Sequence, residues 1–242
     1  MKEERFFYDP EPQTHGVLPD DEAIHAHRVL RLDVGDQFIV MDGNGSFYNS
    51  IITAVSKKRC EYEIINTVKM PRMWNAHLHI AMAPTKNIDR TEWFIEKAVE
   101  IGIDEITLLD TDFSERKKVN ESRMNKIIIS AMKQSRKPYM TKFNGIVKFD
   151  KFINTTDSKQ RYICHCYSDD NIIQIGEKSL LKDSIGALGD VLVMIGPEGD
   201  FSINEVLFAE KLGFKSVSLG DSRLRTETAA LIAVHIMRLF TQ

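Results

Sequence analysis

Met194-Ile-Gly-Pro-Glu-Gly-Asp-Phe-Ser202 and, one helix and one strand later, Leu219-Gly-Asp-Ser-Arg-Leu-Arg-Thr-Glu-Thr-Ala229 carry the strongest structural signal in this chain. Each stretch leaves the end of a predicted strand and runs into a predicted helix. In a parallel sheet we expect the two loops to lie side by side. Gly196, Gly199 and Gly220 allow close backbone approach and positive φ. Such paired loops can form a cofactor pocket from main-chain groups at the carboxyl ends of strands.

The residues around these loops predict an α/β domain with a parallel sheet. Val191 to Ile195 is continuously apolar, as expected of a central parallel strand covered on both faces. Ser202-Ile-Asn-Glu205 has the spacing of a capping box that begins a helix. A last helix is expected from about Glu227 to Phe240. From Trp74 onward strands alternate with helices, so residues 74–242 should form one α/β domain.

Two further helices are predicted within that domain. Asp89-Arg-Thr-Glu92 resembles a capping box and should begin a helix that stops at Gly102. Apolar residues at i, i+3, i+4, i+7 and i+8 spacing over residues 124–132 indicate an amphipathic helix that ends before Pro138.

Residues 1–70 are predicted to form a small β-barrel domain. Asp42-Gly-Asn-Gly45 is a strong hairpin signal between two apolar runs. One short helix is expected, over residues 21–30. Pro71 and its polar surroundings mark the expected boundary with the α/β domain.

Composition narrows the class of protein. The chain has 242 residues, 43% of them hydrophobic, 28% charged, with 3 cysteines and a formal net charge of −3. We expect a globular protein of the reducing cytoplasm, without a signal peptide or a membrane span. Basic residues cluster at Lys57–Arg59, Arg116–Lys118 and Lys133–Lys137, which modestly favours an RNA partner.

Most standard catalytic and cofactor motifs are missing. There is no P-loop, no H-E-x-x-H, no G-x-S-x-G and no G-x-G-x-x-G after a strand, so an ordinary Rossmann site is not expected. Cys164-His-Cys166 has the wrong spacing for zinc and no second ligand pair. We interpret it as part of a strand from Arg161 to Tyr167, with both cysteines on one face, and expect no metal.

Charged residues at the start of the last helix are candidates for chemistry. Thr226 is expected to be the N-cap, with Glu227 favourable near the positive end of the helix. Arg225 is expected to project into the pocket between the glycine loops, because a charge beside two such loops is seldom incidental. Capping and catalysis are compatible here.

Gly196-Pro-Glu-Gly199, Leu219-Gly220 and Leu224-Arg-Thr-Glu-Thr-Ala229 together resemble the ribosomal small-subunit RNA methyltransferase E family, of the SPOUT class. Weaker matches extend the resemblance over most of the chain. They are His27-Arg-Val-Leu-Arg31, Val34-Gly-Asp36, Asp42-Gly43, Glu92 to Gly102, Ser114-Glu-Arg116 and Lys133-Gln-Ser-Arg136. The resemblance implies a PUA-like barrel over residues 1–70 and a trefoil-knotted methyltransferase domain over residues 74–242.

The family's activity is transfer of a methyl group from S-adenosylmethionine to N3 of one uridine in the decoding region of 16S rRNA. The resemblance implies that the cofactor is held by knot loops 194–202 and 219–227. The implied cofactor-binding residues are Ile195, Gly196, Gly199, Leu219, Gly220, Leu224 and Thr226. Arg225 would stabilise charge on the uracil, and either Glu198 or Glu227 would accept the N3 proton.

The implied partners are 16S rRNA within the 30S subunit and a second copy of the chain. Arginines within or beside the matching motifs would contact RNA: Arg28, Arg31, Arg116, Arg136 and Arg223. Two positions depart from the family pattern. Asp200 stands where a second glycine is usual, and Ser222 stands where an arginine is usual, with Arg223 beside it. A different RNA target, or a non-catalytic RNA-binding assembly factor, therefore remain alternative interpretations.

Overall fold

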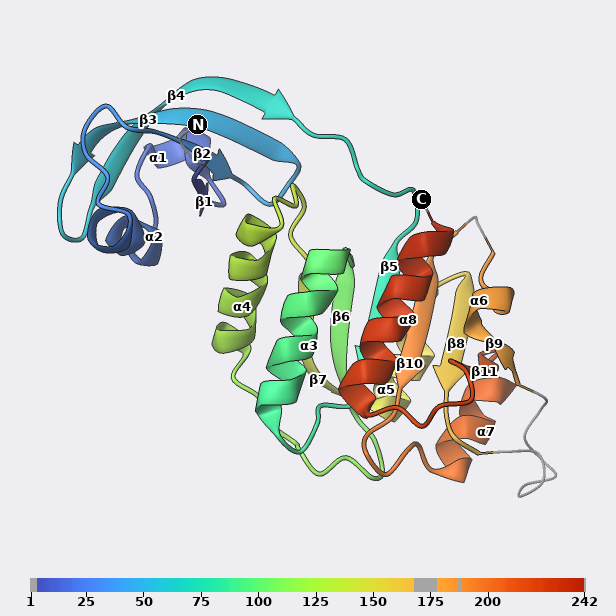
Figure 1. Cartoon of the computed structure of the whole chain (residues 1–242). Coiled ribbons are helices and arrows are strands. Elements are labelled where there is room, and N and C mark those ends of the chain that lie inside the picture. The colour runs from blue at the N-terminus through green and yellow to red at the C-terminus, as the bar shows by residue number, and fades with distance from the viewer. Residues whose placement is uncertain (1–3, 168–177, 187–188, 242) are drawn as a thin grey trace. The chain divides into compact units, whose positions relative to one another are not determined.

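The computed structural model describes residues 4–167, 178–186 and 189–241, which fall into two compact units (Figure 1). The N-terminal unit comprises Met1–Arg72 with Ile129–Met140, and the large unit comprises Met73–Ile128 with Thr141–Gln242. The division differs from the predicted domains, 1–70 and 74–242, because a segment from the middle of the chain belongs to the first unit.

A four-stranded sheet forms the N-terminal unit. Its strands β1 (Phe6–Tyr8), β2 (Gln37–Met41), β3 (Ser46–Val55) and β4 (Cys60–Lys69) pair in that order. β1 is parallel to β2, and the remaining pairs are antiparallel. The predicted hairpin is confirmed between β2 and β3, where Gly43 and Gly45 both have positive φ, 71° and 93°.

The helical part of this unit differs from the single predicted helix. α1 (Pro12–His15) was not expected, and residues 21–30 contain α2 (Asp20–Ile24) followed directly by a π-helical turn, η1 (His25–Val29). Segment 129–140 is joined to the rest of the unit by an ion pair between Lys133 and Glu22. It is also joined through the carbonyl of Pro138, which accepts the N–H of Gly45 at 2.9 Å.

The large unit is built on a parallel sheet, as predicted. Among the described residues its strand order is β7-β6-β5-β10-β8-β11-β9. The strands are β5 (Leu78–Met82), β6 (Glu105–Asp110), β7 (Lys142–Lys148), β8 (Gln160–Cys164), β9 (Ser179–Leu180), β10 (Val191–Ile195) and β11 (Lys215–Ser218). β10 lies near the middle, between β5 and β8, and all five of its residues are buried.

Helices cover both faces of this sheet. They are α3 (Ile88–Ile101), α5 (Phe149–Thr155), α6 (Leu181–Ser184), α7 (Ile203–Lys211) and α8 (Thr226–Phe240). A further helix, α4 (Glu121–Gln134), begins in the large unit and ends in the N-terminal unit, which includes the residues from Ile129. α3 and α8 lie together over one face (Figure 1). α5 and α7 contribute Phe149, Phe152 and Val206 to a core with Leu192 and Met194 of β10. The apolar strand is therefore buried from both sides, which accounts for its unbroken hydrophobic sequence.

Of the two capping boxes predicted at helix starts, one is confirmed and one is wrong. The capping box of α7 is confirmed: Ser202 Oγ accepts the N–H of Glu205, and the Glu205 carboxylate accepts the N–H of Ser202 at 2.8 Å. The one expected at Asp89 is wrong, because the helix is capped two residues earlier, where the Asn87 side chain accepts the N–H of Asp89.

The N-cap expected at Thr226 is also wrong. Thr226 is the first residue of α8, and Arg225 occupies the N-cap position without a side-chain capping hydrogen bond.

Candidate active site

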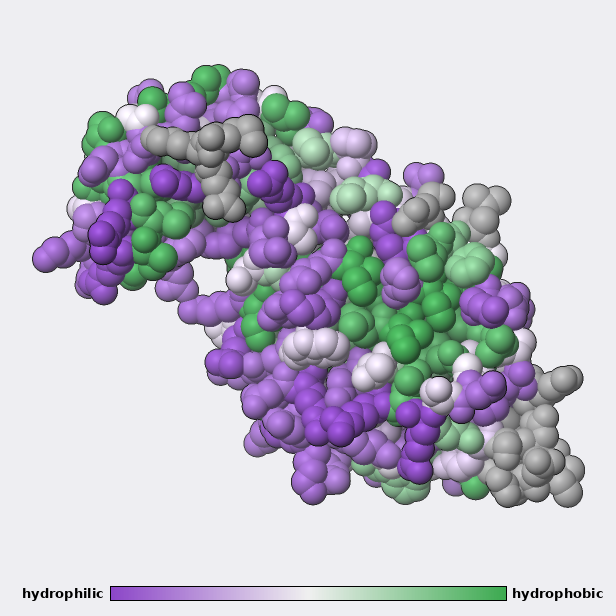
Figure 2. Space-filling model, in the orientation of Figure 1, coloured by the Kyte–Doolittle hydropathy of each residue, from purple (hydrophilic) through white to green (hydrophobic). Residues whose placement is uncertain are grey.

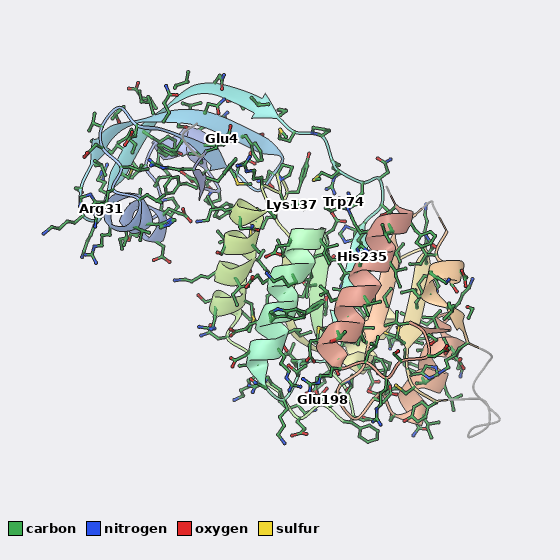
Figure 3. The ribbon with its side chains drawn as sticks, viewed as in Figure 1. Glu4, Arg31, Trp74, Lys137, Glu198 and His235 are labelled. Atoms are coloured by element: carbon green, nitrogen blue, oxygen red, sulfur yellow. The ribbon has the colours of Figure 1, made fainter. Side chains whose placement is uncertain are left out.

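Both glycine-rich loops line one cavity of about 780 Å³ at the carboxyl ends of β8, β10 and β11. Glu198, in the first loop, lies at the end of the large unit opposite Trp74 (Figure 3). The sequence-predicted residues that line the cavity are Ile195, Gly196, Glu198, Gly199, Leu219, Gly220, Arg223, Leu224, Arg225 and Thr226. The structure therefore brings together every predicted cofactor-binding residue and two of the three predicted catalytic residues.

β8 separates the strands that carry the two loops. The loops were expected to follow neighbouring strands, but β10 and β11 each pair with β8 instead. The end of β8 consequently contributes Cys164, His165 and Cys166 to the cavity wall. The strand ends at Cys164, which is buried, whereas Cys166 is exposed, so the two cysteines do not share one face of a strand as expected.

His165 is a neutral side chain in this wall. Burial, with the positive charge of Lys178 as a smaller contribution, lowers the pKa of its imidazole to about 4. Within the described part of the chain, neither of its ring nitrogens has a hydrogen-bond partner. At neutral pH the residue therefore adds no charge to the cavity.

Asp200, which stands where the family has glycine, takes the backbone conformation that glycine favours. Its φ is 68°, a left-handed value that Asp tolerates better than most residues. Its carboxylate accepts the N–H groups of Cys166 and Phe201, each at 2.7 Å. The hydrogen bond from Cys166 ties the loop after β10 to the end of β8, and the one from Phe201 lies within the loop itself.

Glu198 is attached to a neighbouring loop. Its carboxylate accepts the N–H of Lys86 at 3.0 Å. The guanidinium of Arg116 donates to the carbonyls of Thr85 and Lys86, at 3.2 and 2.6 Å. Glu198 thus fixes the loop between β5 and α3 against the loop after β10, and Arg116 fixes it against the segment between β6 and α4.

Glu227 lies behind the cavity wall, in the first turn of α8. It is 7% exposed, and one carboxylate oxygen is 3.7 Å from Nε of Arg90. The other oxygen is buried and has no hydrogen-bond partner among the described residues. Arg225, two residues earlier, is exposed and lines the cavity. An exposed guanidinium in the cavity lining and a buried carboxylate two residues further along the chain are suited to a substrate that gains negative charge and loses a proton.

The five predicted RNA-contacting arginines divide between the units. Arg28 and Arg31 are exposed in the N-terminal unit, and Arg31 has a positive φ of 51°. Arg136 pairs with Glu4 at 3.1 Å and lies over the ring of Phe6. In the large unit Arg223 lines the cavity, and the guanidinium of Arg116 donates hydrogen bonds to main-chain carbonyls.

The sequence-based reasoning missed several cavity residues. Arg90, Lys178 and the Cys164–Cys166 segment all line the cavity. No local motif marks Arg90 or Lys178. The position of Cys164–Cys166 after a strand was visible, but the strand order that inserts β8 between β10 and β11 was not.

Membrane-spanning helices and metal sites are both missing from the described part of the chain. No helix there is both long and apolar enough to cross a membrane. Within the same residues, no group of three or more His, Cys, Asp and Glu side chains is arranged to hold a metal ion.

Known families match both parts of the sequence. The family model described as RNA methyltransferase domain matches residues 72–238, and the RNA methyltransferase PUA domain matches residues 18–65. The ribosomal RNA small subunit methyltransferase E of Rickettsia conorii is 28% identical over 225 residues, which cover 92% of this chain and 88% of the relative.

Solved structures agree with the sequence matches. A probable rRNA methyltransferase from Porphyromonas gingivalis is 38% identical with a TM-score of 0.90, and 98% of each chain is covered. The ribosomal RNA small subunit methyltransferase E of Neisseria gonorrhoeae, bound to S-adenosyl methionine, is 26% identical with a TM-score of 0.84 and the same coverage. The expected fold class, a parallel-sheet methyltransferase domain preceded by a PUA-like domain, is confirmed. The chain belongs to the RNA methyltransferase domain family and, within it, to the ribosomal small-subunit RNA methyltransferase E family.

Proposed function

We propose that this protein transfers the methyl group of S-adenosylmethionine to N3 of one uridine in the decoding region of 16S rRNA. The observation that carries the proposal is the single cavity lined by both glycine loops, with Arg225 at its opening. The family relationship supports the same activity, because the relative from Neisseria gonorrhoeae has S-adenosyl methionine bound.

The cavity residues fit this cofactor. A volume of about 780 Å³ lies in the usual range for small-molecule sites. Apolar walls from Ile195, Val217 and Leu219 suit the adenine ring, and exposed backbone at Gly196 and Gly220 suits its polar edges and the ribose. The carboxylate of Asp200 also lines the cavity and favours a ligand that carries a positive sulfonium. When bound there, the cofactor supplies an electrophilic methyl group.

The chain's own residues prepare the nucleophile. Neutral uridine carries a proton on N3, which must leave as the N3–carbon bond forms and the sulfur–carbon bond breaks. Arg225 stabilises the negative charge that develops on a uracil oxygen. Glu198 or Glu227 accepts the N3 proton, and the product cofactor leaves as neutral S-adenosylhomocysteine.

The two carboxylates can be separated by experiment. Glu198 is exposed, but its carboxylate is bound to the N–H of Lys86, whereas Glu227 is buried beside Arg90. We expect that replacing the true base by glutamine removes the acidic limb of the pH profile of kcat. The other Glu→Gln variant should keep that limb. Calorimetric titration with S-adenosylmethionine controls for loss of the cofactor site.

Further parts of the proposal concern the setting of the reaction. We propose that loops 194–202 and 219–227 belong to a trefoil knot, that the enzyme is a cytoplasmic homodimer, and that its substrate is the 30S particle. We also propose residues 1–70 as an RNA-binding domain and 74–242 as the catalytic domain. Arg28, Arg31, Arg116, Arg136 and Arg223 are proposed RNA contacts. The logarithm of the RNA-binding constant should then fall linearly with the logarithm of the salt concentration.

The dimer proposal rests on α8. Apolar side chains gather over this helix on the face of the large unit seen in Figure 2, and Leu239 and Phe240 are 53% and 41% exposed. An apolar patch of this kind is commonly covered in a symmetric dimer. Analytical ultracentrifugation tests it, and a monomer at micromolar concentration would contradict it.

The central test is transfer of labelled methyl to unmodified 30S particles, with nucleoside mass spectrometry of the product. We expect a single 3-methyluridine in the decoding region. Cofactor binding without incorporation would redirect the proposal to another RNA. If neither binding nor incorporation is found, the protein acts instead as a non-catalytic RNA-binding assembly factor.

A further inference from the structure

Phe113 is an exposed aromatic residue close to the cavity. It lies in the segment between β6 and α4, and 51% of its surface is exposed. Leaving half of such a side chain in water forgoes part of the free energy that its full burial would contribute. Single exposed apolar residues are common, so exposure alone is no argument. The surroundings of Phe113 provide the argument.

The backbone that carries Phe113 is firmly held. Asp112 donates its N–H to the Glu205 carboxylate at 3.0 Å, and its own carboxylate accepts the hydroxyl of Ser202 at 2.6 Å. On the other side of Phe113, the hydroxyl of Ser114 accepts the N–H of Thr111 at 3.0 Å. The segment is therefore pinned to the capping box of α7, and the ring is displayed from a rigid support.

Phe113 lies against the first glycine loop. A Cβ placed on Gly199 would be 3.3 Å from the Cβ of Phe113, and Gly199 lines the cavity. The basic segment Arg116–Lys118 follows within five residues, although the Arg116 guanidinium is bound to main-chain carbonyls and Lys117 is paired with Asp110. A firmly held, half-exposed ring beside the cavity loop is the kind of aromatic group on which proteins stack unpaired bases.

We propose that Phe113 stacks on a base of the RNA substrate and so places the target nucleotide at the cavity. The inference rests on the proposed methyl transfer to RNA and adds a positioning residue to it. An aromatic face suits any base, so Phe113 contributes affinity and placement but little sequence preference.

The test compares variants in methyl transfer to unmodified 30S particles. Phe113→Ala should lower kcat/KM by about 5- to 150-fold, the range given by loss of one base–aromatic stack. Phe113→Trp should restore most of it, because a ring is kept, whereas Phe113→Leu should not. Binding of S-adenosylmethionine and the slope of log affinity against log salt should stay at wild-type values, because no charge and no cofactor contact is changed.

Trp93→Ala is the matched control. Trp93 is an aromatic residue of α3, is 44% exposed, and is not one of the residues that line the cavity. We expect wild-type kcat/KM from it.

Three results would overturn the inference: unchanged kcat/KM in Phe113→Ala, full rescue by leucine, or dissociation of a dimer by Phe113→Ala. The last would assign the ring to an interface with a second copy. Failure of the proposed function is distinct, since wild-type protein itself would then transfer no methyl group.

Discussion

Gly196→Ala should damage both the stability and the cofactor site of this protein. An added Cβ would lie 2.9 Å from the backbone nitrogen of Phe201, 3.0 Å from the carbonyl carbon of Asp200 and 3.1 Å from Cδ2 of Phe201. Two of these atoms are backbone, and the Phe201 ring is fully buried, so none can move aside cheaply. The loop that begins at Gly196 must shift as a whole.

The size of the effect follows from this crowding. Overpacking by one methyl group in a tight site costs about 1–3 kcal/mol. Alanine also lowers the conformational entropy of the unfolded chain, which offsets about 0.4–1 kcal/mol of this cost. For a chain of this length we expect the melting temperature to fall by roughly 2–10 °C. Because the displaced loop lines the cavity, affinity for S-adenosylmethionine should fall at least about tenfold, as small misplacements in such sites do.

Thermal unfolding and calorimetric titration measure the two effects. The matched control is Gly186→Ala, where an added Cβ would meet nothing nearer than Oε1 of Gln160 at 3.4 Å. The control should melt and bind like the wild type. If Gly196→Ala also melts and binds like the wild type, the loop does not have the tight packing that the structure assigns to it.

Three further sets of substitutions, at Ser202, at the two buried histidines and at Arg225, test other parts of the structure. Ser202→Ala removes the cap of α7 and the hydrogen bond to Asp112. It should lower the free energy of unfolding, measured in urea, by about 1–2 kcal/mol. Ser202→Thr keeps a hydroxyl and should retain most of the wild-type stability. Burial lowers the pKa values of His79 and His165 to about 4. The unfolded chain therefore binds more protons between pH 6.5 and 4. The free energy of unfolding should decrease as the pH is lowered through that window, and each histidine should contribute up to about 3 kcal/mol to the decrease. Replacing either by glutamine should flatten the measured slope, and an unchanged slope would refute the assignment. Arg225→Ala should abolish methyl transfer while calorimetry shows cofactor binding within a few-fold of wild type, and surviving activity would remove Arg225 from the mechanism.

Local sequence signals predicted what local physics determines. The apolar run of β10, the capping box at Ser202 and the hairpin at Gly43 each depend on residues within a few positions, and all three are found. The start of α3 was misplaced because two polar residues compete for the cap. The Asn87 side chain accepts the N–H of Asp89, so the helix begins before the predicted box.

Strand order was the part of the site that the sequence could not supply. Nothing in the sequence of β8 indicates that it lies between β10 and β11, because the order arises from long-range packing. As a result the wall at His165 and the hydrogen bond from Cys166 to Asp200 were not predicted. The departure at Asp200 was visible in the sequence, but the two N–H groups that its carboxylate binds were not.

The N-terminal unit is assembled from two separate stretches of chain, so one cut cannot release it whole. A fragment that ends at residue 70 would lack Lys133, the ion-pair partner of Glu22, whose side chain is only 10% exposed. The fragment would also lose the carbonyl of Pro138 that closes the hairpin at Gly45. Chimaeras that exchange this unit between relatives should therefore transplant residues 129–140 together with the N-terminal stretch.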